Sequence, residues 1–438
     1  MTSLELGFWS IGAVLLLIAV RIPIGVVLGG IAVLGISHLR DTNVALGLLK
    51  NTPFEFSANY SLSAIPMFLL MGSIAHHSGI SQALFRAARL WFSGLPGGLA
   101  VATNLACAAF AAASGSSVAT AAAMGRIAIP EMLKQGYEKG LATGVVASAG
   151  TLGSLIPPSI LFVLYGIFAE VSIVKLLIAG VLPGLLTAAI YTVMIITRCK
   201  LNPKLAPPID RAEIAKLKPE RIRALWQVWP LVALIVGIIG GLYGGIVTPT
   251  EAGAAGAVLA LIIAVFQGRM NVEVFRASII EAISATARIF FVAVGAVMYT
   301  KFLSLTGLPG FMSSTIGTWA LDPILLVLAA SIIYVILGMF LDPLGLLLLT
   351  LPVLLPMFEG LGLDLVWFGV LVVKFLEIGL LTPPVGFNVY VIKSVVGDKI
   401  PLETIFRGVG WFLACEVIVV ILLVAFPEIS LYLPSTMN

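Results

Sequence analysis

Residues 153–159 read Gly-Ser-Leu-Ile-Pro-Pro-Ser and interrupt an apolar stretch that extends from residue 141 to 169. Two adjacent prolines remove two backbone donors from a helix and leave carbonyl groups without helical partners. The same dipeptide returns at Pro383-Pro384, inside a second apolar stretch at residues 365–396. A single proline would fit a simple kink, but the repeated pair predicts an unwound segment in the middle of each stretch.

The spacing between the two proline pairs recurs elsewhere in the chain. The residue pairs that share the offset of 226 are Pro23/Pro249, Pro130/Pro356, Pro157/Pro383, Pro158/Pro384, Gly30/Gly256 and Gly153/Gly379. Five predicted membrane crossings separate corresponding points, and because five is odd, the two halves should have opposite orientations. Inverted repeats with interrupted helices are typical of secondary transporters. We therefore predict a first inverted repeat at 1–200, a cytoplasmic linker at 201–228 and a second inverted repeat at 229–438.

The composition requires a membrane environment. Apolar residues make up 60% of the 438 residues and charged residues 11%, whereas a soluble domain carries about 45–50% and about 25%. A membrane span needs about 20 apolar residues. Full crossings are predicted at 4–20, 24–39, 62–78, 141–169, 175–197, 229–248, 251–267, 288–305, 365–396 and 404–426.

Two further apolar segments, 97–134 and 323–358, have a different pattern. Each contains two arms of about 16 residues around a centre with Ser, Gly or Pro. Such an arm reaches about 24 Å, which is less than the roughly 30 Å of the hydrocarbon core. We predict two re-entrant helical hairpins; two short full spans in each segment are the alternative. The predicted fold is an all-α integral membrane protein with about 10 full crossings and two hairpins.

The basic residues indicate the orientation of the chain. The polar stretch 198–223 carries eight Lys or Arg residues against three Asp or Glu residues. Because basic loops remain in the cytoplasm, this stretch is predicted to be cytoplasmic. Counting crossings outward from it places both termini on the outer side.

The centre of the first hairpin, residues 113–120, reads Ala-Ser-Gly-Ser-Ser-Val-Ala-Thr. Small polar residues at the tip of an apolar hairpin indicate backbone that lies within protein or beside a watery cavity. Close packing of helices through small residues is the alternative. Hydroxyl groups at the tip and carbonyl groups freed by the break are oxygen ligands, which suit a hard cation such as sodium.

The second half carries acidic groups in the corresponding segments. Residues 338–345 read Gly-Met-Phe-Leu-Asp-Pro-Leu-Gly, and Glu377 lies just before the second break. Asp342 and Glu377 are ionisable residues within apolar segments, where such residues are costly and usually functional. Lys374 lies three residues before Glu377 on the same helical face, so mutual neutralisation of that pair is an alternative. The half-helix N-termini that follow the breaks would favour an anionic substrate.

Enzyme functions find no support in the sequence. The chain contains no Gly-x-x-x-x-Gly-Lys-Ser/Thr phosphate loop, no His-Glu-x-x-His zinc motif and no Gly-x-Ser-x-Gly nucleophile motif. We therefore expect neither an enzyme nor an ATP-driven pump, no cofactor apart from coupling ions, and no nucleic-acid partner. A stand-alone antiporter or channel, and a membrane-anchored scaffold, remain as alternatives to a transporter with partner proteins.

Several motifs in succession carry a family resemblance. They are Ile65-Pro66-Met67-Phe68, Leu70-Met71-Gly72, Ser114-Gly115-Ser116-Ser117, Ile156-Pro157-Pro158-Ser159, Thr248-Pro249-Thr250-Glu251-Ala252 and residues 377–386, which read Glu-Ile-Gly-Leu-Leu-Thr-Pro-Pro-Val-Gly. With these motifs the chain resembles the large membrane subunit, of the dicarboxylate type, of tripartite ATP-independent periplasmic (TRAP) transporters. They extend through nearly the whole chain in the expected order.

The resemblance implies an assembly and a mechanism. It implies a periplasmic substrate-binding protein, a small four-helix membrane subunit and location in the bacterial inner membrane. Sodium rather than ATP would drive import of a carboxylate, such as a C4-dicarboxylate or sialic acid, by an elevator mechanism. A periplasmic protein would dock on outer segments 40–61 and 306–322 and near Glu251.

The resemblance also assigns candidate site residues. The expected sodium sites lie where each hairpin tip meets a break. The candidate sodium-binding residues are Ser114, Gly115, Ser116, Ser117, Gly153, Pro157, Gly338, Asp342, Gly345, Thr382, Pro383 and Gly386. The candidate substrate-binding residues are Ser116, Ser117, Pro158, Ser159, Pro384 and Asn388.

Overall fold

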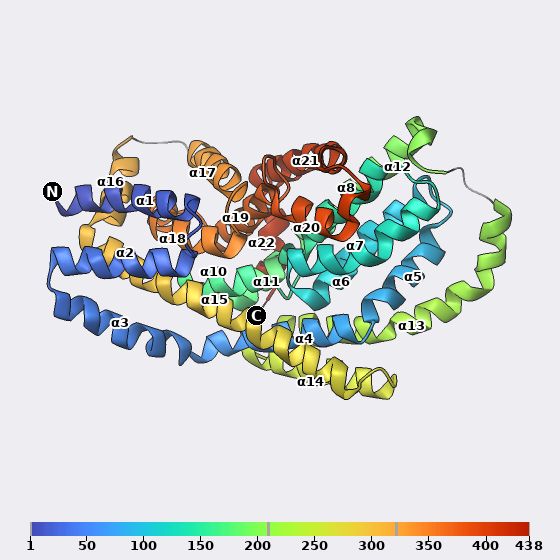
Figure 1. Cartoon of the computed structure of the whole chain (residues 1–438), viewed down its shortest axis with the longest axis horizontal. Helices are drawn as coiled ribbons and strands as arrows, with labels where there is room; N and C mark the ends of the chain where they lie inside the picture. The colour runs from blue at the N-terminus through green and yellow to red at the C-terminus, as the bar shows by residue number, and fades with distance from the viewer. Residues whose placement is uncertain (1, 208–210, 320–322, 438) are drawn as a thin grey trace.

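The computed structural model describes residues 2–207, 211–319 and 323–437, without the side chains of 211–219, 225 and 316–319. Every regular element within these ranges is a helix, which confirms the predicted all-α class. Figure 1 shows an elongated bundle with helices α1 (Ser3–Ala19) and α2 (Ile24–Leu39) at one end. Helices α5 (Ile80–Phe92) and α12 (Val181–Leu201) lie toward the other end. The chain between α2 and α5 therefore extends along the bundle from one end toward the other.

Both segments predicted as hairpins form pairs of helices, and their re-entrant character stays a prediction. The first consists of α6 (Gly98–Ser114) and α7 (Ser117–Lys134), and the second of α17 (Pro323–Gly338) and α18 (Pro343–Gly360). The first tip turns at Gly115, whose φ of 63° is in the left-handed region that favours glycine. Helices α7 and α18 have 18 residues each, slightly more than the predicted arm length.

Both predicted breaks are present as well. In the first half, α8 (Lys139–Gly150) and α9 (Leu152–Leu155) are followed by α10 (Ile160–Phe168) after a bend of 41°. In the second half, α19 (Leu365–Gly379) stops before the proline pair and α20 (Phe387–Val396) starts after it. Each proline pair, which lacks backbone donors, thus lies in a segment that belongs to no helix: four residues in the first half and seven in the second.

The helix boundaries follow the 226-residue offset of the sequence. Helix α7 starts at Ser117 and α18 at Pro343, while α8 starts at Lys139 and α19 at Leu365; both differences are 226 (343 − 117 and 365 − 139). One pair departs from this symmetry. Helices α3 (Thr42–Ser57) and α4 (Ala64–His77) form a pair bent by 58°, whereas the corresponding region of the second half is the single helix α15 (Val272–Thr306).

Part of the polar stretch after α12 is helical. Helix α13 (Arg211–Tyr243) begins inside the predicted linker and continues into the next apolar segment. Residues 211–224 are rich in Ala, Glu, Lys, Leu and Arg, which favour helix. The Arg221 Nε donates to the Leu90 carbonyl at 2.9 Å, and the Trp91 Nε1 donates to the Arg221 carbonyl at 3.3 Å. This part of α13 therefore packs along α5.

Helix length supports a multi-pass membrane protein. Six helices of the described chain are long and apolar enough to cross a membrane, and the two bent pairs raise the number to eight. Helices α1, α2, α6 and α17 are apolar but have only 16 or 17 residues. The ten predicted crossings include α1 and α2, so the crossing number stays a prediction.

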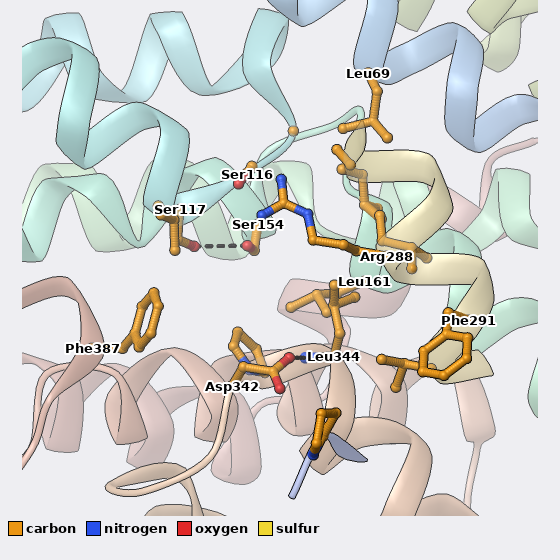
Figure 2. A pocket seen from close by; sticks show the side chains of 18 residues that line it. Leu69, Ser116, Ser117, Ser154, Leu161, Arg288, Phe291, Asp342, Leu344 and Phe387 are labelled. Carbon is orange, nitrogen blue, oxygen red and sulfur yellow. Dashed lines mark hydrogen bonds between the residues drawn. The ribbon is translucent and has the colours of Figure 1, made fainter. Parts of the chain in front are cut away.

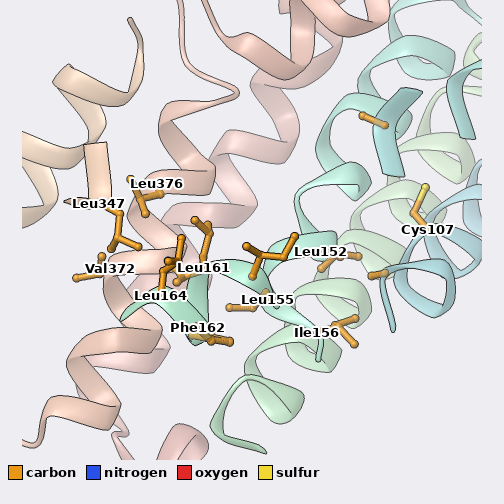
Figure 3. Packing of buried hydrophobic residues seen from close by; sticks show 14 of the residues in the cluster. Cys107, Leu152, Leu155, Ile156, Leu161, Phe162, Leu164, Leu347, Val372 and Leu376 are labelled. Carbon is orange, nitrogen blue, oxygen red and sulfur yellow. The ribbon is translucent and has the colours of Figure 1, made fainter. Parts of the chain in front are cut away.

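The buried core joins the two halves. Figure 3 shows Leu155 at the end of α9 beside Leu161 and Phe162 of α10, with Leu376 of α19 close to α10 and Ile156 of the first break on the far side of Leu155. All of these side chains are at most 7% exposed. The first break is buried throughout, so its free carbonyl groups are held within protein, where irregular backbone is tolerated at membrane depth. In the second break, Pro383 and Pro384 are exposed.

Candidate functional site

The first hairpin tip and the first break touch through their backbones. A Cβ atom added at Gly115 would lie 2.5 Å from the Pro158 carbonyl oxygen. One added at Gly153 would lie 2.6 Å from the Ser116 carbonyl oxygen. Only glycine allows this approach at either position. The predicted meeting of Ser114–Ser117 with residues 153–159 is therefore present in the structure.

A chain of hydrogen bonds connects this contact to an acid from the other half. The Ser117 Oγ lies 2.6 Å from both carboxylate oxygens of Glu377 and donates to them. The Ser154 Oγ lies 2.7 Å from the Ser117 Oγ and can donate in turn. All three side chains are at most 4% exposed. Sequence reasoning marked Glu377 as functional but did not place it at the first tip, because 260 positions separate it from Ser117.

Lys374 does not neutralise Glu377. Its Nζ lies 2.5 Å from the Glu416 Oε2 and 3.0 Å from the Thr187 Oγ1, and Tyr191 donates its hydroxyl hydrogen to the Glu416 Oε1. The alternative of a Lys374–Glu377 pair was therefore wrong: the helical spacing is right, but α19 packs with Lys374 against α21 (Leu402–Ala425). Within the described chain, Glu377 forms no ion pair.

The second tip uses its acid differently. The Asp342 Oδ1 accepts hydrogen bonds from the backbone of Leu344 at 3.1 Å and Gly345 at 3.0 Å, and so caps α18. Gly338 lies against Gly379, where a Cβ atom on Gly379 would be 2.7 Å from the Gly338 Cα. A charged carboxylate is well placed at a helix N-terminus. The second tip thus also meets the helix that precedes its break.

The break in the second half contains the remaining sodium candidates. Thr382 donates its hydroxyl hydrogen to the Ile378 carbonyl at 2.7 Å, and Pro383 follows it in the non-helical segment. Gly386 has a φ of 59° and immediately precedes α20. Within the described residues, no hydrogen bond joins Thr382 to Asp342. These residues are near a tip in the fold, but they do not form a hydrogen-bonded cluster like that of the first tip.

One cavity of about 490 Å³ is lined by both hairpin tips. Figure 2 shows Ser116, Ser117 and Ser154 on one side and Asp342 with Leu344 on the other. The cavity brings together four of the predicted sodium residues, namely Gly115, Ser116, Ser117 and Asp342. The two tips are 226 positions apart in sequence, and only the tertiary fold places them around the same space.

Arg288 of α15 is a site residue that sequence reasoning missed. In Figure 2 its side chain extends into the space between the tips and its guanidinium points toward Ser116 and Ser154. Among the described residues that line the cavity, it is the only basic one and Asp342 is the only acidic one. A second cavity of about 620 Å³ also contains Arg288 and Ser116 and continues along α7 to Arg126. Its position in a long apolar helix does not reveal the direction in which the side chain points.

The other candidate substrate residues do not line this cavity. Ser159 is fully buried and donates to the Ser154 carbonyl at 2.5 Å, while Asn388 is fully buried and donates to the Ala147 carbonyl at 3.3 Å. Pro158 faces Gly115 through its carbonyl group, and Pro384 lies in the second break. Phe387, the neighbour of Asn388, reaches the cavity instead. A substrate role for these four residues stays a prediction.

Glu251, the candidate partner contact, has a local role. Its Oε2 accepts from the Thr248 backbone at 2.8 Å and from the Thr248 hydroxyl at 2.9 Å, and the Thr248 Oγ1 accepts from the Glu251 backbone. This is a capping box at the start of α14 (Pro249–Phe266). The carboxylate is exposed, so the cap leaves a contact with a partner open.

Two helix pairs, two broken helices and a cavity shared by both tips, with a few polar groups in a mainly apolar lining, are typical of a membrane transporter. Residues 11–429 match the family described as "Tripartite ATP-independent periplasmic transporter, DctM component". The chain belongs to this family, which confirms the resemblance seen in the sequence.

Individual relatives agree with this placement, and one solved structure shares the fold. The chain is 37% identical to the C4-dicarboxylate TRAP transporter large permease protein DctM of Pseudomonas aeruginosa over 87% of this chain and 88% of the relative. It is 32% identical to the sialic acid TRAP transporter large permease protein SiaM of Vibrio cholerae over 94% and 96%. The YdaH transporter of Alcanivorax borkumensis has a similar fold, with a TM-score of 0.61, 14% identity and coverage of 88% and 90%. The relatives are permeases, in line with the expectation that the chain is not an enzyme.

Proposed function

We propose that this protein is the large permease subunit of a sodium-coupled importer that moves a small organic anion. The observation that carries the proposal is the single cavity between both hairpin tips, with Arg288 as its basic lining residue. A carboxylate in this cavity would gain the Arg288 charge and the Ser116 hydroxyl group. Charge-assisted hydrogen bonds from Arg to carboxylate are about twice as strong as neutral ones. The printed functions of the relatives support a C4-dicarboxylate or sialic acid as the substrate class.

Sodium is the proposed coupling ion, and one acid lies at each tip to bind it. Glu377 supplies a buried carboxylate at the first tip, and Asp342 supplies one at the second. Hard cations prefer carboxylate, carbonyl and hydroxyl oxygens, and both tips present such groups beside helix breaks. The positive charge of a bound sodium ion would offset the cost of an ionised acid in a dry site. No ATP-binding motif is present in the sequence, which agrees with an ion gradient as the energy source.

An elevator movement is the proposed mechanism. Close glycine contacts join the first tip to the first break at Gly115 and Gly153 and the second tip to α19 at Gly338, so these parts should move as one body. A crosslink between the first hairpin and α13, within residues 229–243, should stop transport while leaving docking of the binding protein intact. Full transport by a quantitatively crosslinked sample would contradict the movement.

The proposed assembly contains a small four-helix membrane subunit and a periplasmic substrate-binding protein. The family is tripartite, which supports both partners. We place the protein in the bacterial inner membrane with both termini in the periplasm, because the basic stretch 198–223 favours the cytoplasm. A stand-alone antiporter or channel would need no binding protein. Reconstitution with and without the binding protein separates the two possibilities.

The anion site is tested by uptake into proteoliposomes with an imposed sodium gradient and both partners present. Arg288→Gln should reduce uptake about tenfold or more, since a hydrogen bond to a charged group is worth about 1.5–3 kcal/mol. Arg276→Gln, an exposed change on the same helix outside the cavity, is the matched control and should keep normal uptake. Normal uptake by the Arg288 variant would remove the cavity from the substrate path.

A further inference from the structure

A second hollow lies away from the hairpin tips, between α12 and α21. It has a volume of about 710 Å³. Most of its lining is aliphatic or aromatic, and the polar members, Thr197, Arg198 and Asn202, come from one end of α12. A groove with one polar end and a long apolar remainder is complementary to an amphipathic molecule, which has a polar head and an apolar tail.

Arg198 at the polar end has an unmet hydrogen-bonding requirement. Its guanidinium lies over the Trp411 ring, 4.5 Å from the ring centroid. Its Nη1 atom is buried and has no hydrogen-bond partner among the described residues. A buried donor without a partner costs about 1–3 kcal/mol, and more when it is charged. An anionic oxygen at this position would remove that cost.

The groove opens on the outer surface of the bundle. Val193 of α12 is 64% exposed, and Trp411 and Ile418 of α21 are 54% and 50% exposed. These large apolar side chains suit contact with lipid chains. Arg198 lies in the last turn of α12, at the start of the basic stretch 198–223. By the positive-inside rule this end of α12 is at the cytoplasmic leaflet, where acidic lipids and basic pockets between helices meet.

We propose that the groove binds an acidic phospholipid. The phosphate group would accept hydrogen bonds from Arg198 and Asn202, and an acyl chain would follow the apolar walls toward Ala189. Trp411 would then cover both the guanidinium and the first part of the chain. A transmembrane helix of a partner protein fits less well, because its apolar face would leave the buried Nη1 donor unsatisfied.

The test uses the tryptophan at the site. The purified full chain is placed in vesicles of phosphatidylcholine to which phosphatidylglycerol or phosphatidylcholine with brominated acyl chains is added. The Trp411 signal is the difference between the wild type and Trp411→Phe. Brominated phosphatidylglycerol should quench this signal at a several-fold lower mole fraction than brominated phosphatidylcholine does. Equal quenching by the two lipids would overturn the proposal.

Two variants, and the addition of the small membrane subunit, test the lipid proposal further. Arg198→Gln should abolish the preference for phosphatidylglycerol, whereas the neighbouring exposed change Lys200→Gln should keep it. Retained preference in a folded Arg198 variant would contradict the role of the guanidinium. Protection of Trp411 by the small membrane subunit, without any lipid preference, would show that the groove is a protein interface instead. If Arg198→Gln does not fold, native mass spectrometry of the wild type decides, because selective retention of phosphatidylglycerol is required.

Discussion

The two hairpin tips share a backbone arrangement but differ in how they use their acidic groups. At the first tip, Ser117 is hydrogen-bonded to Glu377, which comes from the opposite half and caps no helix. At the second tip, Asp342 belongs to the tip itself and caps α18. The comparison shows that a repeated fold need not repeat its chemistry. One half supplies the hydroxyl groups of the first tip, and the other half supplies both acids.

A comparison with Glu416 explains why Glu377 is the stronger candidate for binding a cation. Glu416 is equally buried but is paired with Lys374, so its charge is already balanced within the protein. Glu377 lies one helical turn from Lys374 and has serine donors instead. Buried charges are normally paired or bind a cation. The unequal pairing therefore indicates where an added cation would be stabilised.

The largest effect is expected from removing the charge at the first tip. Glu377→Gln keeps the shape and an oxygen that accepts from Ser117, but it removes the anionic ligand. Sodium-dependent uptake should fall about 10- to 100-fold, since a charged hydrogen-bonding group is worth about 1.5–3 kcal/mol. Uptake at several sodium concentrations measures the change. Glu359→Gln, an exposed change at the end of α18, is the control; unchanged sodium dependence in Glu377→Gln would exclude this acid from coupling.

A smaller but clear effect is expected at the second tip. Asn can still accept the two backbone hydrogen bonds that cap α18, so Asp342→Asn should fold while losing the charge. Uptake should decrease about tenfold, and its sodium dependence should weaken. Asp364 is a matched control, because it caps α19 through Val366 and Trp367 in the same way but lies outside the cavity. Equal losses in Asp342→Asn and Asp364→Asn would mean that capping, not ion binding, explains the effect.

The hairpins and breaks could be predicted from sequence because their signals are local. Proline removes a donor and glycine permits a tight turn wherever they occur, so Gly115 and Pro157-Pro158 mark their own positions. The partners of Glu377 and Lys374 could not be predicted in this way. Helical spacing brings Lys374 and Glu377 to one face, but the rotation of α19 against α12 and α21 decides which residues they meet. The direction of Arg288 depends on the same kind of long-range packing.

The serine residues of the first tip should give moderate effects that differ from each other. Ser117→Ala removes the donor to Glu377 and the link to Ser154, so sodium affinity should decrease about three- to tenfold, as expected for one hydrogen bond worth about 1 kcal/mol. Ser116→Ala removes only a 3.4 Å cap to the Ala119 backbone, and its effect on sodium affinity should be smaller. Titration of uptake with sodium measures both. A reversed order would place the sodium ion nearer to Ser116 than to Glu377.

The smallest effect is expected at Glu251, which lies outside the cavity. Unlike Glu377, this acid takes part in the capping box at the start of α14. Glu251→Gln preserves the acceptor of the capping box, whereas Glu251→Lys reverses the charge and removes the acceptor. If the carboxylate steers the binding protein, Glu251→Lys should slow uptake about twofold at low concentrations of that protein, and added salt should reduce the difference, because exposed charges are screened. Glu251→Gln should then show an intermediate rate. Equal slowing at all concentrations and salt levels would assign the loss to the helix cap, and unchanged uptake in both variants would remove Glu251 from the docking surface.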